Sequence, residues 1–200
     1  GTLLDIDHGT YPFVTSSNTS SGNAAVGSGV GPKNIDRIVG VTKAYISRVG
    51  SGPFVTEQKN EIGDYLIEKG AEFGVVTGRR RRCGWLDLVS LKYSVRVNSL
   101  TELFITKLDV LSGLDELKLC IGYNTENKVI TDYPYELTTL ESAEPVYETF
   151  DGWSDDISSV KNYDDLPENA KTYLKAIEDF IAVPITFISV GPERTENIII

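Results

Sequence analysis

The segment from residue 170 to residue 191 constrains the fold most strongly, because it joins a helix directly to a strand. Apolar side chains recur on one face of a predicted helix over residues 170–181, at Tyr173, Leu174, Ile177, Phe180 and Ile181. Pro184 ends this helix, and the apolar run of residues 185–191 predicts a strand that enters a tight turn. A helix followed at once by a strand is typical of folds that pack both kinds of element together.

The rest of the chain interleaves helices and strands in the same way. Residues 8–34 are rich in Gly, Ser, Thr and Asn, which predicts a loop. Residues 35–48 are apolar without a clear period and indicate either a helix or a buried strand. We expect further helices over 60–70 and 85–97, and further strands over 1–7, 103–106, 116–123 and 128–131. The fold class predicted is therefore mixed α/β.

Composition limits the possible functions. The chain has 200 residues, enough for one domain with a substantial core, and its net charge of −10 argues against a general nucleic-acid or membrane-surface binder. Two cysteines form no disulfide framework, and free thiols fit a cytoplasmic protein. Because the chain contains no methionine, we expect residues 1–200 to be one region cut from a longer polypeptide.

A candidate base-binding element follows the strand predicted over residues 103–106. Lys107 and Asp109 are separated by one residue, as in the guanine-reading element of P-loop GTPases. A carboxylate can accept hydrogen bonds from both N1–H and the 2-amino group of guanine, whereas adenine offers neither donor. The lysine stem can pack over the base. A solvated strand end remains the alternative, because this short pattern is common by chance.

A run of four arginines, residues 79–82, is the second candidate site. Guanidinium groups recognise phosphate and carboxylate through paired hydrogen bonds, and a basic cluster in an acidic chain concentrates positive potential in one place. These properties favour a small anionic metabolite. The alternatives are a solvated basic loop and an RNA-binding patch, and the net charge opposes the latter.

A third candidate lies at the end of the last predicted strand, where Gly191 permits a close approach of the backbone and Pro192 fixes the turn. An ordinary tight turn is an equal interpretation.

Together these segments resemble the adenylosuccinate synthetases. The resemblance covers essentially the whole chain, in family order, and corresponds to the last half of the family's usual length. It is carried by residues 1–12, 14–19, 52–54 with Thr56 and Glu57, 77–82, 106–111, 147–149 with Gly152 and Trp153, and Gly191 and Pro192 with Arg194 and Thr195. It implies the C-terminal portion of a P-loop-NTPase-like fold.

The resemblance also implies ligands for particular residues. IMP would be bound by Thr15, Val49, Gly50 and Arg79. Aspartate would be bound by Val75, Val76, Thr77, Gly78, Arg79, Arg80 and Arg81. GTP would be bound by Arg81, Lys107, Leu108, Asp109, Ser189, Val190 and Gly191. Valines 75, 76 and 190 can contribute through the backbone.

The reaction implied has two steps. The 6-oxygen of IMP attacks the γ-phosphate of GTP, and the amino group of aspartate then displaces the phosphate. The family's phosphate loop, Mg²⁺ ligands, general base and catalytic histidine belong to the N-terminal half, so we expect no catalytic or metal-binding residue here. His8, Asp5 and Asp7 are interpreted as structural.

The resemblance further implies a homodimer for the full-length enzyme. A guanine-nucleotide-binding module without catalysis is the alternative function, but it would need a G-x-x-x-x-G-K-[ST] loop that the sequence lacks. For residues 1–200 alone we expect a folded but inactive protein.

Overall fold

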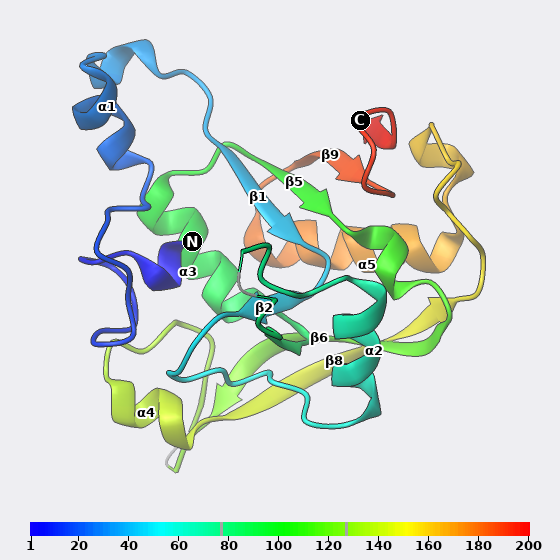
Figure 1. Cartoon of the computed structure of the whole chain (residues 1–200), viewed down its shortest axis with the longest axis horizontal. Helices are drawn as coiled ribbons and strands as arrows, with labels where there is room; N and C mark the ends of the chain where they lie inside the picture. The colour runs from blue at the N-terminus through cyan, green and yellow to red at the C-terminus, as the bar shows by residue number, and fades with distance from the viewer. Residues whose placement is uncertain (77, 127) are drawn as a thin grey trace.

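A parallel sheet forms one layer of the molecule. The computed structural model describes residues 1–76, 78–126 and 128–200. Strands β1 (Val39–Lys43), β5 (Glu102–Thr106) and β9 (Ile185–Ser189) run parallel, and β10 (Asn197–Ile199) adds antiparallel to β9 (Figure 1). Because the strands share one direction, their carboxyl ends lie at the same edge.

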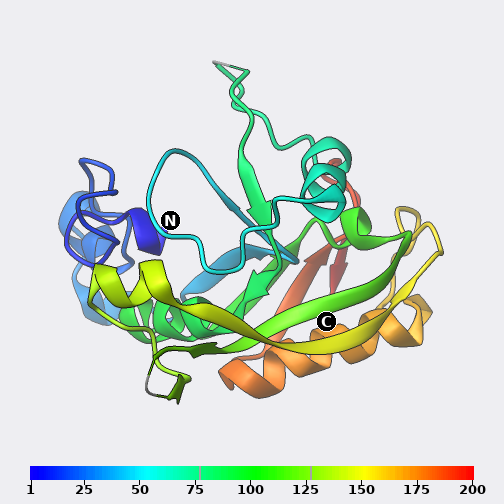
Figure 2. The same cartoon turned by 90° about the horizontal axis from the view of Figure 1, so that it is seen from below.

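A second sheet is built on two long antiparallel strands, β6 (Leu114–Asn124) and β8 (Glu144–Trp153). Short strands β4 (Leu86–Asp87) and β7 (Val129–Ile130) complete it. Figure 2 shows β6 and β8 crossing the molecule beside α5 (Glu168–Ile181). A separate antiparallel pair, β2 (Ile46–Arg48) with β3 (Arg82–Gly84), places Arg48 opposite Arg82.

The helices begin where the chain supplies a cap. α2 (Glu61–Lys69) is capped by the Asn60 side chain, and α3 (Leu88–Asn98) by the Asp87 side chain. Shorter helical segments fill the connections: α1 (Gly22–Ser28), α4 (Leu137–Ser142), η1 (Thr2–Leu4), η2 (Pro32–Asn34), η3 (Leu108–Leu111) and η4 (Tyr163–Asp165). No helix in the described part of the chain is both long and apolar enough to span a membrane.

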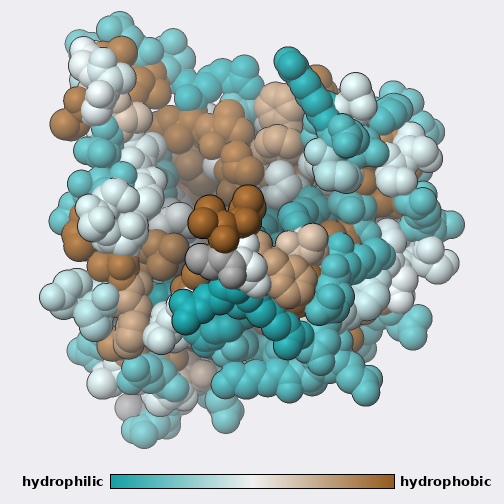
Figure 3. All heavy atoms as spheres, viewed as in Figure 1, coloured by the Kyte–Doolittle hydropathy of each residue, from teal (hydrophilic) through white to brown (hydrophobic). Residues whose placement is uncertain are grey.

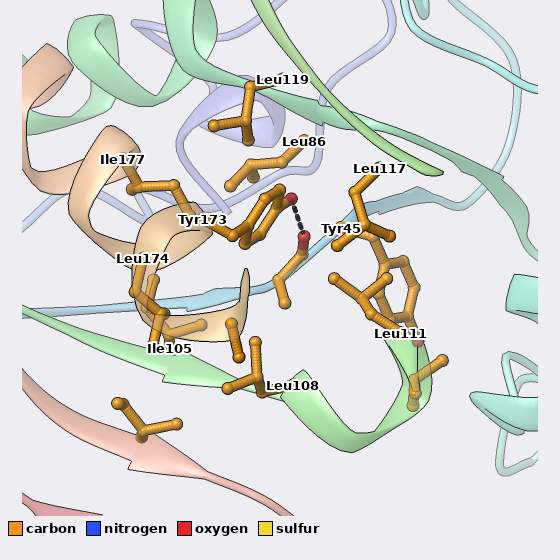
Figure 4. Packing of buried hydrophobic residues seen from close by; sticks show 14 of the residues in the cluster. Tyr45, Leu86, Ile105, Leu108, Leu111, Leu117, Leu119, Tyr173, Leu174 and Ile177 are labelled. Atoms are coloured by element: carbon orange, nitrogen blue, oxygen red, sulfur yellow. Dashed lines mark hydrogen bonds between the residues drawn. The ribbon is translucent and has the colours of Figure 1, made fainter. Parts of the chain in front are cut away.

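The main core lies where α5 meets strands of both sheets. Tyr173, Leu174 and Ile177 of α5 pack with Ile105 of β5 and Leu117 of β6 (Figure 4). The Tyr173 hydroxyl donates to the Ala44 carbonyl oxygen at 2.7 Å, so this helix also fixes the turn between β1 and β2. The core therefore holds in place the strand ends on which the candidate site is built.

The mixed α/β prediction is confirmed, as are the helices predicted over 60–70 and 170–181. The helix predicted over 85–97 exists but begins at Leu88, because Leu86 and Asp87 pair with β6 as strand β4. The predicted strands over 103–106, 116–123, 128–131 and 185–191 are confirmed as β5, β6, β7 and β9. The ambiguous residues 35–48 form the two strands β1 and β2. The loop predicted over 8–34 is interrupted by α1 and η2.

The strand predicted over residues 1–7 is wrong. Residues 2–4 form the 3₁₀ turn η1, and the chain then folds around the buried carboxylate of Asp5. That carboxylate accepts hydrogen bonds from the backbone N–H groups of Asp7, His8, Thr19 and Ser20. These donors are committed to a side chain and cannot form a sheet, in agreement with a structural role for Asp5.

Candidate active site

The three parallel strands deliver candidate residues to one edge of the sheet. Lys43 ends β1, Lys107 follows β5, and Ser189 ends β9. The register pairs Lys43 with Thr106, and Ile105 with Ile188, so the three ends are direct neighbours. In open α/β sheets, ligands bind outside the carboxyl ends of the strands. The structure thus brings together segments that are far apart in the sequence.

The Lys107–Asp109 segment turns sharply after β5. Lys107 has φ 60°, a left-handed conformation, and its Nζ donates to the Gly70 carbonyl oxygen. Asp109 is half-buried, and this burial raises the pKa of its carboxyl group. The side chain of Leu108 is fully buried in the core, so contact between Leu108 and a ligand would involve its backbone.

The loop after β9 is closely packed beside this segment. The Ser189 hydroxyl donates to the Gly191 carbonyl oxygen at 2.8 Å, and the Val190 amide donates to the Glu196 carbonyl oxygen at 3.0 Å. The Val190 side chain is buried. The Glu196 carboxylate lies directly over Gly191, where a Cβ atom would come within 2.3 Å of its oxygen and the Glu196 side chain would have to move.

The arginine run follows a loop that projects from the body of the protein between α2 and β3 (Figure 2). Val75 and Val76 are almost completely exposed on this loop. Thr77 lies outside the described residues. Gly78 has φ 63°, and Arg79 is exposed. The Arg80 guanidinium pairs with Asp64 on the surface.

Arg81 points instead toward a buried carboxylate. Glu72 is fully buried and accepts hydrogen bonds from Arg81 Nη1 at 2.8 Å, Lys43 Nζ at 2.6 Å and the Tyr45 hydroxyl at 2.5 Å. Burial alone would raise the pKa of Glu72, but these donors outweigh burial and lower it to about 2. Glu72 is therefore an anion that holds cations from separate elements.

Two further arginines hold the segments implied for IMP. Arg48 is buried and donates to Thr10 Oγ1 at 2.9 Å and to the Phe13 carbonyl oxygen at 3.1 Å. Arg82 pairs with Glu57 through two hydrogen bonds and donates to the Gly50 and Gly52 carbonyl oxygens. The first set tethers the loop that carries Thr15, and the second fixes the turn at Val49 and Gly50.

A cavity of about 600 Å³ opens among these segments. Its lining includes the cations Lys43, Arg48 and Arg81, together with Val49 and apolar residues of β1. Figure 3 shows a hollow with hydrophobic surface over β1, bordered by hydrophilic side chains. Thr15 does not line the cavity. Its amide donates to the carbonyl oxygen of Leu4 at 2.8 Å, and Leu4 does line the cavity. Cations beside an apolar wall suit an anionic ligand with a flat ring.

Sequence reasoning missed the residues that hold this site together: Lys43, Tyr45, Arg48 and Glu72. Glu72 had one weak signal, because it is a charged residue between Ala71 and Phe73, just after the glycine that ends α2. His8 is exposed, and no cluster of three or more His, Cys, Asp or Glu side chains in the described ranges could hold a metal ion.

The fold and the site define an α/β protein with a cluster of cations at the carboxyl edge of a parallel sheet. The sequence profile of the adenylosuccinate synthetase family matches residues 1–198, and the chain belongs to this family of GTP-dependent ligases of purine biosynthesis. It is 59% identical over 198 residues to the adenylosuccinate synthetase of Halothermothrix orenii, and 56% identical over 199 residues to that of Clostridioides difficile. Each match covers 99% or 100% of this chain and 46% of the relative.

Solved structures agree with this assignment. The fully ligated adenylosuccinate synthetase from Plasmodium falciparum superposes with a TM-score of 0.97 and 48% identity, covering 100% of this chain and 48% of that one. A cyanophage succinoaminodeoxyadenylate synthetase, 18% identical with a TM-score of 0.57, shares the fold. The chain thus spans about half the length of the relatives that it matches.

Proposed function

We propose that residues 1–200 supply the guanine-binding element, the aspartate-binding loop and part of the IMP site of an adenylosuccinate synthetase. The full-length protein would convert IMP, aspartate and GTP into adenylosuccinate, GDP and phosphate. The observation that carries the proposal is the ion-pair cluster at Glu72, which joins Lys43 at the end of β1, Lys107 after β5 and Arg81 of the arginine run, and of these Lys43 and Arg81 also line the cavity. Such convergence is what a reaction between several anionic substrates requires.

Asp109 is the proposed reader of guanine. Its half-buried carboxylate lies after β5, next to the Ser189–Gly191 turn after β9. A carboxylate held there gains two hydrogen bonds from guanine and is left unpaired by adenine, which selects GTP over ATP. Lys107 would pack its stem on the ring, while Leu108 and Val190 would contribute backbone groups only.

The arginine loop is the proposed site for aspartate. Arg79, Arg80 and Arg81 would bind its carboxylates, with Val75, Val76 and Gly78 supplying backbone contacts, and Thr77 belongs to the same proposed set. Arg80 would have to exchange Asp64 for the ligand. Arg79 with Thr15, Val49 and Gly50 would contact IMP, and Arg81 would lie between aspartate and GTP. Its buried Nε has no hydrogen-bond partner among the described residues, which supports a ligand-binding role.

Mg²⁺ is the cofactor that the family implies, but the described residues offer no cluster of carboxylates to hold it. We therefore assign no step of the reaction to a metal bound by this part of the chain. A homodimer of the full-length protein is also part of the proposal.

The test uses a polypeptide of full family length carrying Asp109→Asn. The amide donor meets the guanine 2-amino group unfavourably but suits the 2-oxo group of xanthine. We expect kcat/KM for GTP to fall by roughly two orders of magnitude and use of XTP to rise. Steady-state rates with GTP, XTP and ATP measure both effects.

Asp115→Asn is the matched control, because Asp115 is exposed at the start of β6 and carries the same chemical change. It should leave both rates unchanged. If the Asp109→Asn protein still prefers GTP to XTP, then Asp109 does not read guanine and the segment after β5 is only a strand end.

A further inference from the structure

Glu72 lies just beyond the end of α2 and has no contact with the cavity. Gly70 caps the helix, Ala71 adopts a left-handed conformation with φ 48°, and the Glu72 amide donates to the Ile67 carbonyl oxygen at 2.8 Å. This backbone path turns the Glu72 side chain inward, where it is fully buried. Glu72 is not among the residues that line the cavity, so any effect on ligands must pass through other side chains.

The Glu72 carboxylate holds three cations from three different elements. Lys43 ends β1, with its Nζ 2.6 Å from Oε1, and Arg81 precedes β3, with Nη1 2.8 Å from Oε2. Lys107 follows β5, and its Nζ is 3.5 Å from Oε1. One anion among three cations leaves the cluster positive, so the cations remain available to anionic ligands while their positions are fixed.

The attachment to Arg81 is double. Besides the ion pair, the Arg81 amide donates to the Glu72 carbonyl oxygen at 2.9 Å. Lys107 is likewise held at two points, since its Nζ also donates to the Gly70 carbonyl oxygen next to the same turn. The turn at residues 70–72 is therefore a shared support for the arginine loop and for the segment after β5.

We propose that Glu72 is a positioning residue that couples the guanine site to the aspartate loop, by holding Lys107 and Arg81 on one carboxylate. This inference rests on the proposed function. A ligand that moves or fixes Lys107 changes the position of Glu72 and, through it, of Arg81. We expect GTP to fix Lys107 and thereby hold Arg81 in place for aspartate, so that each ligand raises the affinity for the other, and linkage requires the two factors to be equal.

Glu102 provides a matched control. It is also buried and paired with an arginine, accepting from Arg37 Nε at 2.7 Å, from Arg37 Nη2 at 2.6 Å and from the Thr186 hydroxyl at 2.6 Å. It begins β5, whereas Lys107 follows the end of the same strand, so Glu102 lies at the opposite edge of the sheet. Neutralising Glu102 removes a buried charge, whose partner Arg37 is 67% exposed, without disturbing the cluster at Glu72.

The experiment measures the dissociation constant of aspartate, with IMP present, in the absence and presence of a non-hydrolysable GTP analogue. It uses the full-length protein and its Glu72→Gln and Glu102→Gln variants. We expect the analogue to tighten aspartate binding by about fivefold or more in the wild type and in Glu102→Gln. In Glu72→Gln the factor should fall to about one. Glu72→Asp keeps the charge but shortens the side chain, so its factor should lie between those of the wild type and Glu72→Gln. It replaces Glu72→Gln in the test if that variant does not fold.

The outcomes distinguish failure of the proposed function from failure of the coupling through Glu72. A wild type that does not bind aspartate overturns the proposed function and this inference with it. A wild type that binds aspartate with a factor of one overturns the inference alone. The inference is also overturned if the Glu72 variants keep the full factor by which the GTP analogue tightens aspartate binding. It is overturned as well if Glu102→Gln loses this factor to the same extent as Glu72→Gln, because that would indicate a general effect of removing a buried charge.

Discussion

At the scale of single residues, the buried carboxylate of Asp87 makes the free energy of unfolding depend on pH. It is buried, caps α3 by accepting from the Ser90 amide at 3.1 Å, and accepts from the Tyr123 hydroxyl at 2.5 Å. Burial outweighs these donors and raises the pKa of Asp87 to about 6. The folded state therefore binds more protons than the unfolded state between pH 4 and 6, and this residue makes stability fall as pH rises through that window.

Asp87→Asn should remove this cost while keeping an oxygen that can cap α3. The unfolding free energy of the variant minus that of the wild type is expected to rise by about 2 kcal/mol from pH 4 to pH 6.5. Urea unfolding at a series of pH values measures it. Asp5→Asn is the control, because four backbone donors outweigh burial and lower the pKa of Asp5. For Asp5→Asn the difference in unfolding free energy should therefore fall, not rise, with increasing pH. A flat difference for Asp87→Asn would contradict the prediction.

At the scale of elements, α5 supports the site through a buried hydrogen bond from Tyr173 within an apolar core. The Tyr173 hydroxyl reaches the Ala44 carbonyl oxygen between Lys43 and Tyr45, two of the groups that bind Glu72 (Figure 4). Tyr173→Phe leaves a buried carbonyl without this donor and is expected to lower the unfolding free energy by about 1–2 kcal/mol. Urea unfolding provides the measurement.

Tyr11→Phe is the matched control for this contact, since Tyr11 is largely exposed and loses the same hydroxyl. Its unfolding free energy should remain within about 0.5 kcal/mol of the wild type. Equal stability of Tyr173→Phe and Tyr11→Phe would show that the hydrogen bond to Ala44 contributes nothing.

The elements predicted from the sequence are those with a strong local pattern. α5 has an apolar face and a following proline, and β9 is a continuous apolar run, so both could be predicted. β8 could not, because Glu144–Trp153 lacks regular alternation and its pairing with β6 supplies the order. The strand expected over residues 1–7 failed because the Asp5 side chain captures backbone donors.

The residues of the candidate site also differ in whether the sequence could predict them. Lys107, Asp109 and the arginine run stand out as local motifs, so the sequence alone indicates them. The role of Glu72 depends on Lys43, which is 29 residues away, and on Lys107, which follows β5. Such a cluster exists only once the sheet has formed, and a single sequence carries no local signal for it.

At the scale of the whole molecule, β1 leaves one edge of the parallel sheet open beside the cavity that its side chains help to line. Among the described residues β1 pairs only with β5, and its other edge faces the hollow seen in Figure 3. Val39 and Val41 on this strand are 41% and 67% exposed. An unpaired edge with exposed valines is a template for another strand. Because the chain spans 46% of its relatives' length, the remaining part of the family's chain is the occupant that we expect there.

Residues 1–200 alone are therefore expected to form no adenylosuccinate from IMP, GTP and aspartate, since they contain no G-x-x-x-x-G-K-[ST] phosphate loop. Addition of a separate polypeptide covering the rest of a relative's length should restore measurable turnover and slow the hydrogen exchange of the β1 amides. Val41→Lys places a charge on the open edge and should prevent both effects, while the far-ultraviolet circular dichroism of the isolated chain stays the same. Turnover by residues 1–200 alone would contradict this account of where the chemistry lies, and restoration by the Val41→Lys chain would exclude β1 as the contact.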